Sequence, residues 1–290
     1  MGPFGDLLMN SHIPLLALFA VALPGCVIQV HSAEDNRELD EAITAVSLDL
    51  DSGGVTVMAS DAGAVSVYRR AEWSAVPPEM SLEVVDGVLI LTSACTAGQL
   101  VCRAEHELHL PPGVRVEGVV GSGGFFAEGF IGDLTLNIGS GGAVLEEGEG
   151  AVTLDIGSGG VVVDGHVGEI SVDVGSGGAV LSEVSGDLNL FVSSGGVVAD
   201  GLTSTSVVAE VSSGGLSLDF DARPTLIDGD VSSGGAQVTV PAGAYRLELS
   251  ADSGGVSVDG VQDDPESDDV IRLNVSSGGI SLEGDDDDGR

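Results

Sequence analysis

The fold of this chain is decided by a stretch that recurs along it, VTLDIGSGGVVVDG at residues 152–165. In its first half Val152, Leu154 and Ile156 alternate with polar residues, which is the period of a strand with one buried face. The triplet beginning at Ser158 follows, and its glycines accept the positive φ angles of a tight turn. Val161 and Val163 then alternate again. The stretch therefore predicts a strand, a turn and a second strand.

The Ser-Gly-Gly triplet recurs along most of the chain. From Ser122 onwards, successive triplets are 18, 18, 18, 18, 19, 20, 20 and 24 residues apart. The triplets begin at Ser52, Ser122, Ser140, Ser158, Ser176, Ser194, Ser213, Ser233, Ser253 and Ser277. One repeat cannot bury its apolar face alone, so a fixed period of this size predicts stacked repeats. We expect an all-β fold, a parallel β-solenoid with coils of about 18–20 residues, right-handed by the crossover preference of parallel strands.

The regular repeat occupies only part of the chain, residues 121–284. Residues 44–120 contain alternating strands at irregular spacing, which predicts an irregular N-terminal β region that caps the solenoid. Residues 26–43 are polar and unpatterned and are predicted to form a tether. Residues 285–290 begin with four aspartates, which we expect to form a solvated acidic tail that blunts the last exposed strand edge.

The N-terminus has the pattern of an export signal. Leu15 to Leu23 is an apolar run of nine residues, the length of a signal-peptide core and too short for a membrane span. Residues 23–26, Leu-Pro-Gly-Cys, resemble a bacterial lipobox, so residues 1–25 are predicted to be a signal peptide and Cys26 the lipidated mature N-terminus. No basic residue precedes the run, which leaves a cleaved, unlipidated signal or a short buried helix as alternatives. The expected location is the cell envelope outside the cytoplasm, with the lipid as the only membrane contact.

Export also bears on Cys95 and Cys102, which lie in a small polar loop. Disulfides form in oxidising compartments, so the two cysteines are predicted to pair. Two buried thiols are the alternative.

The charge of the chain excludes several functions. The sequence has 46 Asp and Glu against nine Arg and no Lys, a net charge of −37. A phosphate-binding face needs a basic patch, so nucleic acid is excluded as a partner, and the absence of lysine excludes Schiff-base chemistry. The acidity does not mean disorder, because 43% of the residues are hydrophobic and can build an aliphatic core.

Acidic residues recur six positions after the repeat serines. They include Asp164, Asp200, Asp219 and Asp259. In stacked coils these aspartates would form a line, and carboxylates about 5 Å apart could bind Ca²⁺ weakly between them. The alternative is that Asp before Gly starts a turn and stays hydrated. No other cofactor is predicted.

Other chemical constellations are weak. His106 and His109 are three residues apart and would point to opposite faces of a strand. The serine column could form a hydroxyl ladder for a ligand, or each serine could cap its own turn. Solenoid polysaccharide lyases need a basic catalytic residue in a walled cleft. The regular array offers only Arg223, Arg246 and Arg272, and its loops are short.

Two segments carry a family resemblance. Residues 106–116 (HELHLPPGVRV) and 238–247 (VTVPAGAYRL) each read strand, Pro-Gly turn, strand, and the chain closes with SGGISLEG at residues 277–284. This order resembles the bacterial β-strand-repeat family called domain of unknown function 4097, over roughly residues 44–284. The resemblance implies an exported or membrane-anchored, adhesin-like β-solenoid, and it supplies no catalytic residues.

Together these features predict a non-enzymatic, lipid-anchored scaffold of adhesin type. Its expected partner is a cell-surface or envelope protein or polysaccharide. Two alternatives are an envelope-sensing or regulatory accessory protein and, more weakly, a polysaccharide-active β-helix enzyme.

Overall fold

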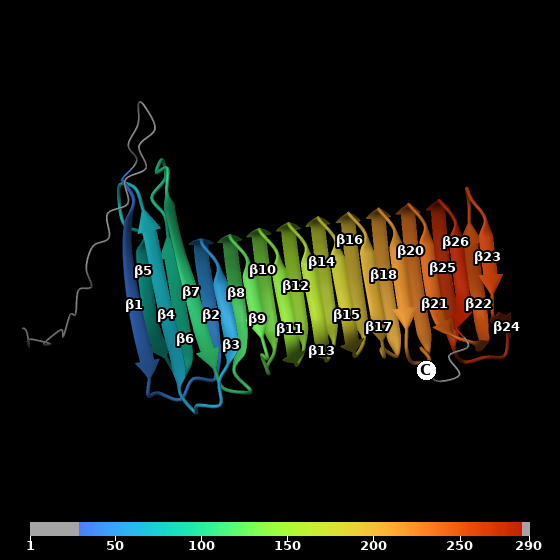
Figure 1. The fold of residues 1–290 in the computed structure, drawn as a ribbon, viewed down its shortest axis with the longest axis horizontal. Helices are drawn as coiled ribbons and strands as arrows, with labels where there is room; N and C mark the ends of the chain where they lie inside the picture. Colours follow the sequence, from blue (N-terminus) through green and yellow to red (C-terminus); the bar gives the residue numbers. More distant parts are fainter. Residues whose placement is uncertain (1–28, 286–290) are drawn as a thin grey trace, which may run out of the picture.

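The computed structural model describes residues 29–285. In this range the chain forms 26 β-strands and no helix, and the strands make two 13-stranded sheets that face each other (Figure 1). The all-β prediction is therefore confirmed. Among these residues no helix has the length and hydropathy to cross a membrane. The predicted signal peptide, Cys26 and residues 286–290 of the acidic tail lie outside the described residues.

The first sheet is antiparallel at its N-terminal end and parallel elsewhere. In spatial order its strands are β1 (His31–Leu39), β4 (Val65–Trp73), β7 (Cys102–Leu110), β3 (Val55–Ala59), β9 (Phe125–Glu128), β11 (Ala143–Glu149), β13 (Val161–Val167), β15 (Ala179–Ser185), β17 (Val197–Leu202), β19 (Leu216–Phe220), β21 (Ala236–Pro241), β26 (Ile280–Asp285) and β23 (Val256–Asp259).

The second sheet is also mostly parallel, with one antiparallel pair at its N-terminal end. In spatial order its strands are β24 (Val261–Asp263), β22 (Gly243–Ala251), β25 (Val270–Ser277), β20 (Leu226–Ser233), β18 (Ser206–Ser213), β16 (Leu188–Ser194), β14 (Ile170–Ser176), β12 (Val152–Ser158), β10 (Leu134–Ser140), β8 (Arg115–Ser122), β2 (Ala45–Ser52), β6 (Val88–Ala94) and β5 (Glu79–Val85).

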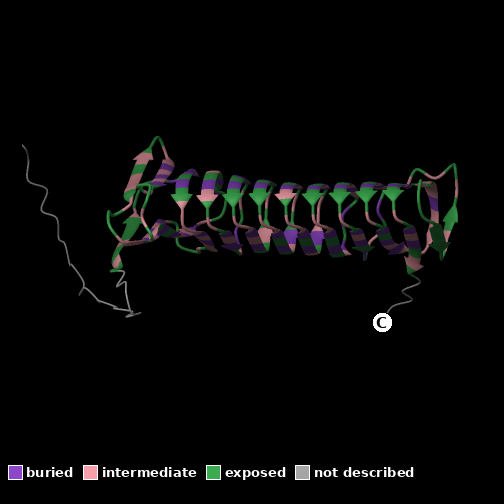
Figure 2. Ribbon diagram, turned by 90° about the horizontal axis from the view of Figure 1, so that it is seen from above, coloured by how far each residue is buried: buried purple, intermediate pink, exposed green. Residues whose placement is uncertain are grey.

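A strand of the second sheet, a Ser-Gly-Gly turn and a strand of the first sheet make one unit, here called a coil. Neighbouring coils align without offset, so that Leu154 pairs with Leu136 and Ile156 with Ile138. The alternating residues point between the sheets, where Val152, Leu154 and Ile156 are all buried, and Figure 2 shows this alternation of buried and exposed residues along the strands. The aliphatic core is thus a set of ladders that run the length of the molecule.

The first glycine of each triplet is fixed by the stacking of the turns. Gly159 has a φ of 135°, and a Cβ added there would lie 1.8 Å from the carbonyl oxygen of Gly141 in the neighbouring coil. Only a residue without a side chain fits this position, because both the backbone conformation and the close approach exclude a Cβ. The same contact recurs from coil to coil, which explains why the triplet is repeated so faithfully.

The coils do not follow chain order at either end. The coil of β2 and β3 lies between that of β6 and β7 and that of β8 and β9, and Ser52 pairs with Ser122 in the regular register. At the other end β25 and β26 return to lie between β20–β21 and β22–β23. Residues 45–59 therefore belong to the regular array. The last strand of the chain, β26, is internal, and β23 and β24 form the edge of the stack at this end.

The tether prediction is wrong for residues 31–39. His31–Leu39 forms β1, which pairs antiparallel with β4 over its whole length. The strand covers the first sheet's N-terminal edge, so most of its side chains stay exposed. A polar edge strand of this kind lacks the apolar alternation by which strands are recognised.

Candidate binding surface

In-register stacking turns each outward position of the coil into a line of side chains. On the outer face of the first sheet, Glu128, Glu146, Asp164, Ser182 and Asp200 pair one after another. We call this line the acidic column. Its four carboxylates are exposed, so stacking keeps them in water while it aligns them.

The column does not unite the four aspartates proposed as a Ca²⁺ site. Ser182 separates Asp164 from Asp200 and donates a hydrogen bond of 2.9 Å to the latter. A register shift follows Ala199, and farther along Thr239 and Glu283 separate Asp219 from Asp259. Among residues 29–285 no three His, Cys, Asp or Glu side chains converge as metal ligands do. The geometry therefore gives no support to the Ca²⁺ prediction.

Carboxylates do crowd near Asp219. Partial burial, followed by the charges of Asp221, Asp285 and Asp200, raises the pKa of the Asp219 carboxyl. Burial and neighbouring like charges both disfavour the ionised form of a carboxyl group.

A line of apolar side chains runs beside the acidic column, and the sequence analysis did not predict it. Phe126, Val144, Val162, Val180 and Val198 pair in register on the same outer face. We call this line the apolar ladder. Val162 and Val180 are 42% exposed and Val198 is 47% exposed. Its members stand four residues after each repeat serine, two before the acidic position, and that offset could have revealed it.

Shallow hollows flank the apolar ladder at both ends. One, of about 530 Å³, is lined by Thr56, Tyr68, Glu107, Phe126 and Val144 together with neighbouring residues. The other, of about 540 Å³, lies over Val198, Ser217, Gln237 and Ser281. Second glycines of the triplets line both hollows, Gly54, Gly124 and Gly142 in the first and Gly196, Gly215, Gly235 and Gly279 in the other, and the missing side chains leave the space. This outer face is thus an apolar stripe with a shallow hollow at each end, and carboxylates lie beside it.

A second line of acidic residues lies on the outer face of the other sheet. Asn137, Asp155 and Asp173 pair in register, then Phe191 interrupts, and Glu210 and Asp230 continue the line. Beside this line the outward positions include Thr135, Thr153 and Ser171, which pair in register and are polar. The two outer faces therefore share their charge and differ in apolar content.

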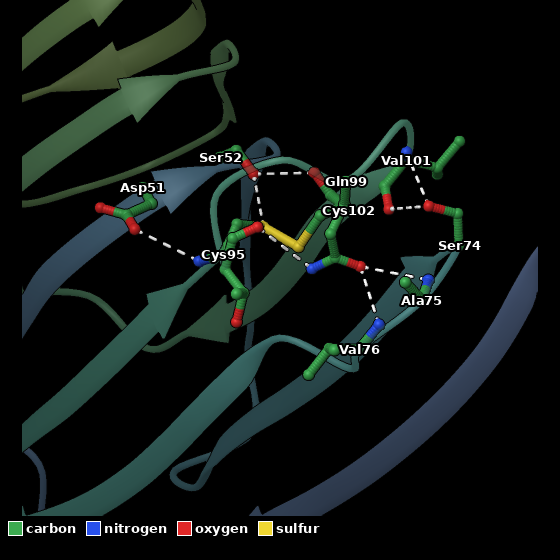
Figure 3. Close-up of a disulfide and its surroundings, with 10 residues drawn as sticks. Asp51, Ser52, Ser74, Ala75, Val76, Cys95, Gln99, Val101 and Cys102 are labelled. Atoms are coloured by element: carbon green, nitrogen blue, oxygen red, sulfur yellow. Dashed lines mark hydrogen bonds between the residues drawn. A yellow bond between two sulfur atoms is a disulfide. The ribbon is translucent and has the colours of Figure 1, made fainter.

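A disulfide replaces the glycine turn in one coil of the N-terminal region. Cys95 and Cys102 are joined, with their Cα atoms 5.9 Å apart (Figure 3). Ser52, the serine of the neighbouring coil, donates a hydrogen bond of 3.0 Å to the Cys102 carbonyl and lies 3.1 Å from Cys95 Sγ. The Cys95 N–H donates to the Asp51 carboxylate. The bridge closes the wider loop of a coil that has no Ser-Gly-Gly.

Two histidines are buried between the sheets. His166 lies 2.8 Å from the Gly150 carbonyl through Nε2, which identifies Nε2–H as the donor. His106 and its register partner Arg69 are both buried, and neither His106 ring nitrogen has a hydrogen-bond partner. Burial, reinforced by the Arg69 charge, lowers the pKa of His106 to about 4. His109 points outward and contacts Glu107, so the prediction that His106 and His109 face opposite ways is confirmed.

The arginines of the regular array are engaged with carboxylates. Arg272 donates to Glu248 at 2.8 Å and to Asp228 at 2.7 Å, which ties β22, β25 and β20 together. Arg246 lies 3.6 Å from Glu248. Arg223 is paired with Asp269. The Arg272 contacts brace strands of neighbouring coils, whereas the Arg246 contact lies within β22 and the Arg223 pair joins two connecting segments.

Comparison with known proteins gives limited guidance. No family model matches the chain, and no curated protein matches it. Among solved structures, a "putative adhesin" of Parabacteroides distasonis is 11% identical, with 86% of this chain and 96% of that chain covered and a TM-score of 0.45. A "putative adhesin" of Parabacteroides merdae is 11% identical, with 87% and 95% covered and a TM-score of 0.39. A "putative lipid binding protein" of Parabacteroides distasonis is 14% identical, with 86% and 96% covered and a TM-score of 0.33. At these values the likenesses decide neither family nor function.

Proposed function

We propose that this chain is an exported, non-enzymatic β-solenoid, right-handed, that acts as an adhesin-like scaffold at the cell surface. A lipid on Cys26 would hold it in the membrane, and the partner would be a surface or envelope protein or polysaccharide. The observation that carries the proposal is the furrowed outer face of the first sheet, where an apolar ladder runs beside an acidic column over successive coils. Such a face offers area and charge to an extended partner.

Membership of the family called domain of unknown function 4097 is part of the proposal. The positions of the two Pro-Gly elements in the fold support this membership. Pro112-Gly113 connects β7 to β8, and Pro241 to Gly243 connects β21 to β22. Both connections are points where the chain order of the coils is broken. The resemblance thus coincides with the unusual steps of the topology.

Binding to native envelope material tests the role of this face. One variant would carry Glu146→Gln, Asp164→Asn and Asp200→Asn in the acidic column. The matched control would carry Asp155→Asn, Asp173→Asn and Glu210→Gln on the other sheet, with the same change in net charge. We expect the first variant to lose most of its capture of envelope partners and the control to retain it. Equal loss in both would mean that only net charge matters and would reject the face.

Export and anchoring are tested separately. Mass analysis of the mature N-terminus is expected to find a lipidated Cys26, and Cys26→Ser is expected to move the protein out of the membrane fraction. An unmodified Met1 would overturn the proposed location. The absence of catalysis is tested by incubation with a panel of polysaccharides, where turnover that is lost in Arg246→Gln or Arg272→Gln would replace the scaffold with an enzyme.

A further inference from the structure

The two ends of the sheet stack are built differently. At the N-terminal end the antiparallel strands β1, β4 and β5 extend the sheets, and the outermost strand β1 is polar. At the opposite end the stack finishes with β22, β23 and β24 (Figure 1). Repeat proteins need terminal units with a polar outer surface to stay soluble, so an end without one is a place to look for a partner.

The apolar interior is open at this C-terminal end. Val256 and Val258 of β23 are 47% and 40% exposed, whereas their register partners Ile280 and Leu282 in β26 are 3% and 0% exposed. The facing residues of β22, among them Leu249, are only partly buried. Among residues 29–285, therefore, no further layer covers the inward side chains of this last coil.

The backbone of this coil is also unpaired on one side. β23 is the last strand of its sheet. The short strand β24 pairs only with residues 243–245 of β22, and the Leu247 N–H beyond it is satisfied by the Asp263 carboxylate. Because Gly255 presents its carbonyl to Ile280, the parallel pattern turns the N–H and C=O groups of Val256 and Val258 away from β26. An edge of this kind pairs with an added strand.

The charges around the open end indicate which charge an added strand would carry. Exposed carboxylates lie in β23, in β24 and in the connections next to them, at Asp252, Asp259, Asp263, Glu266 and Asp268; we call them the carboxylate rim. Within residues 29–285 none of these forms a salt bridge, because the nearby arginines are paired with Glu248, Asp228 and Asp269. A second copy of this end would bring the same carboxylates face to face, and like charges at an interface cost affinity. A basic partner would instead be attracted by these carboxylates.

We propose that the C-terminal end of the stack binds an extended, basic segment of another polypeptide, which adds as a strand to β23. Alternate apolar side chains of that segment cover Val256 and Val258, and the intervening basic side chains reach the carboxylate rim. The inference deepens the scaffold role proposed above, which it rests on, by naming a second surface and the chemistry of its partner.

The probe is a synthetic nine-residue peptide of alternating valine and arginine, with fluorescence anisotropy as the readout. Binding is expected to weaken as salt rises. A valine–glutamate peptide is expected not to bind. A valine–arginine peptide methylated on alternate backbone nitrogens cannot form the strand ladder and is expected to bind much more weakly. Equal binding of the methylated peptide would reduce the interaction to charge alone and overturn strand addition.

Protein variants locate the site. Val256→Asn with Val258→Asn is expected to weaken peptide binding roughly tenfold, the loss expected for two half-covered valines. The control is Val85→Asn with Val119→Asn, two valines of similar exposure in β5 and β8 of the second sheet, away from the apolar ladder and from the open end, and it is expected to bind the peptide as wild type does. Circular dichroism spectra and thermal melting curves are recorded to check that both variants are folded. The reverse ranking would overturn the proposal.

Two outcomes separate this inference from the scaffold role. If envelope capture persists while the peptide fails to bind, the scaffold role stands and the end site falls. If the peptide binds while envelope capture fails, the end site stands alone. Sedimentation of the protein without peptide tests whether a second copy of the chain binds at this end instead. A dimer in wild type that is monomeric in Val256→Asn with Val258→Asn would show that it does, and would overturn the basic partner.

Discussion

Gly159→Ala tests the reason for the repeated triplet. The new Cβ would lie 1.8 Å from the Gly141 carbonyl oxygen, where contacts below 3.0 Å are not tolerated, so the two coils must separate by more than 1 Å. The hydrogen bonds from Gly141 N–H to Ser158 and from Ala143 N–H to Gly160 join these coils at the turn. Losing them costs about 1 kcal/mol each, and a non-glycine residue at a φ of 135° costs about 1–3 kcal/mol more. We expect a destabilisation of about 3–5 kcal/mol.

Two other glycines separate the clash from the backbone strain. Gly98→Ala has a φ of 87° and nothing within 4 Å of the added Cβ, so it is expected to cost only the left-handed strain of about 1–2 kcal/mol. Gly63→Ala also meets open space and has no positive φ, and it is expected to be neutral or slightly stabilising. Urea denaturation measures all three, with hydrogen exchange at the turn to localise the effect. A Gly159→Ala variant no less stable than Gly98→Ala would refute the stacking argument.

Three further predictions concern the buried polar groups and the disulfide. The pKa of His106 is lowered to about 4 in the folded protein, so protonation of this histidine does not reduce stability above pH 6.5 but removes about 3 kcal/mol of the free energy of unfolding by pH 4. In His106→Leu the urea midpoint is therefore expected to fall less between pH 7 and pH 4.5 than in wild type. An equal fall in both proteins would assign the loss to other groups. Replacing Cys95 and Cys102 together by alanine is expected to lower the free energy of unfolding by about 2.5 kcal/mol, because the unfolded chain gains loop entropy. The same loss in wild-type protein treated with a reductant would confirm that the disulfide is its source. The Tyr245 hydroxyl donates to the Pro241 carbonyl at 2.8 Å, so Tyr245→Phe should cost about 1 kcal/mol, and a neutral result in a thermal melt would show that water replaces it.

The regular coils were predictable because one physical pattern is repeated in them. Alternation around Leu154 and the triplet at Ser158 determine which side chains point inward and where each turn falls. The acidic column followed from the same alignment. The sequence also contains the apolar ladder, because Val162 and its equivalents recur at the outward position between two inward residues, but a valine at an exposed position carries no signal of its own in the alternation.

The order of the coils at the ends was not predictable from the pattern. The coils with a Ser-Gly-Gly triplet present the same aliphatic ladder and the same glycine turn to their neighbours, so the coil of residues 45–59 fits against either side of several others. The choice depends on the connecting segments around Pro112 and Pro241, whose paths no periodicity describes. β1 was missed for a related reason, since an edge strand such as His31–Leu39 is stabilised by backbone pairing with β4 and by little buried apolar area.

The placing of β25 and β26 inside the stack has a mechanical consequence. Each of them pairs with a strand on both sides, so a force applied at the C-terminal end of the chain must shear two ladders at once. A force at the N-terminal end meets β1, which pairs only with β4 and can unzip one bond at a time. Under tension the described chain is expected to yield first at its N-terminal side, while its C-terminal side stays locked and keeps its shape under load.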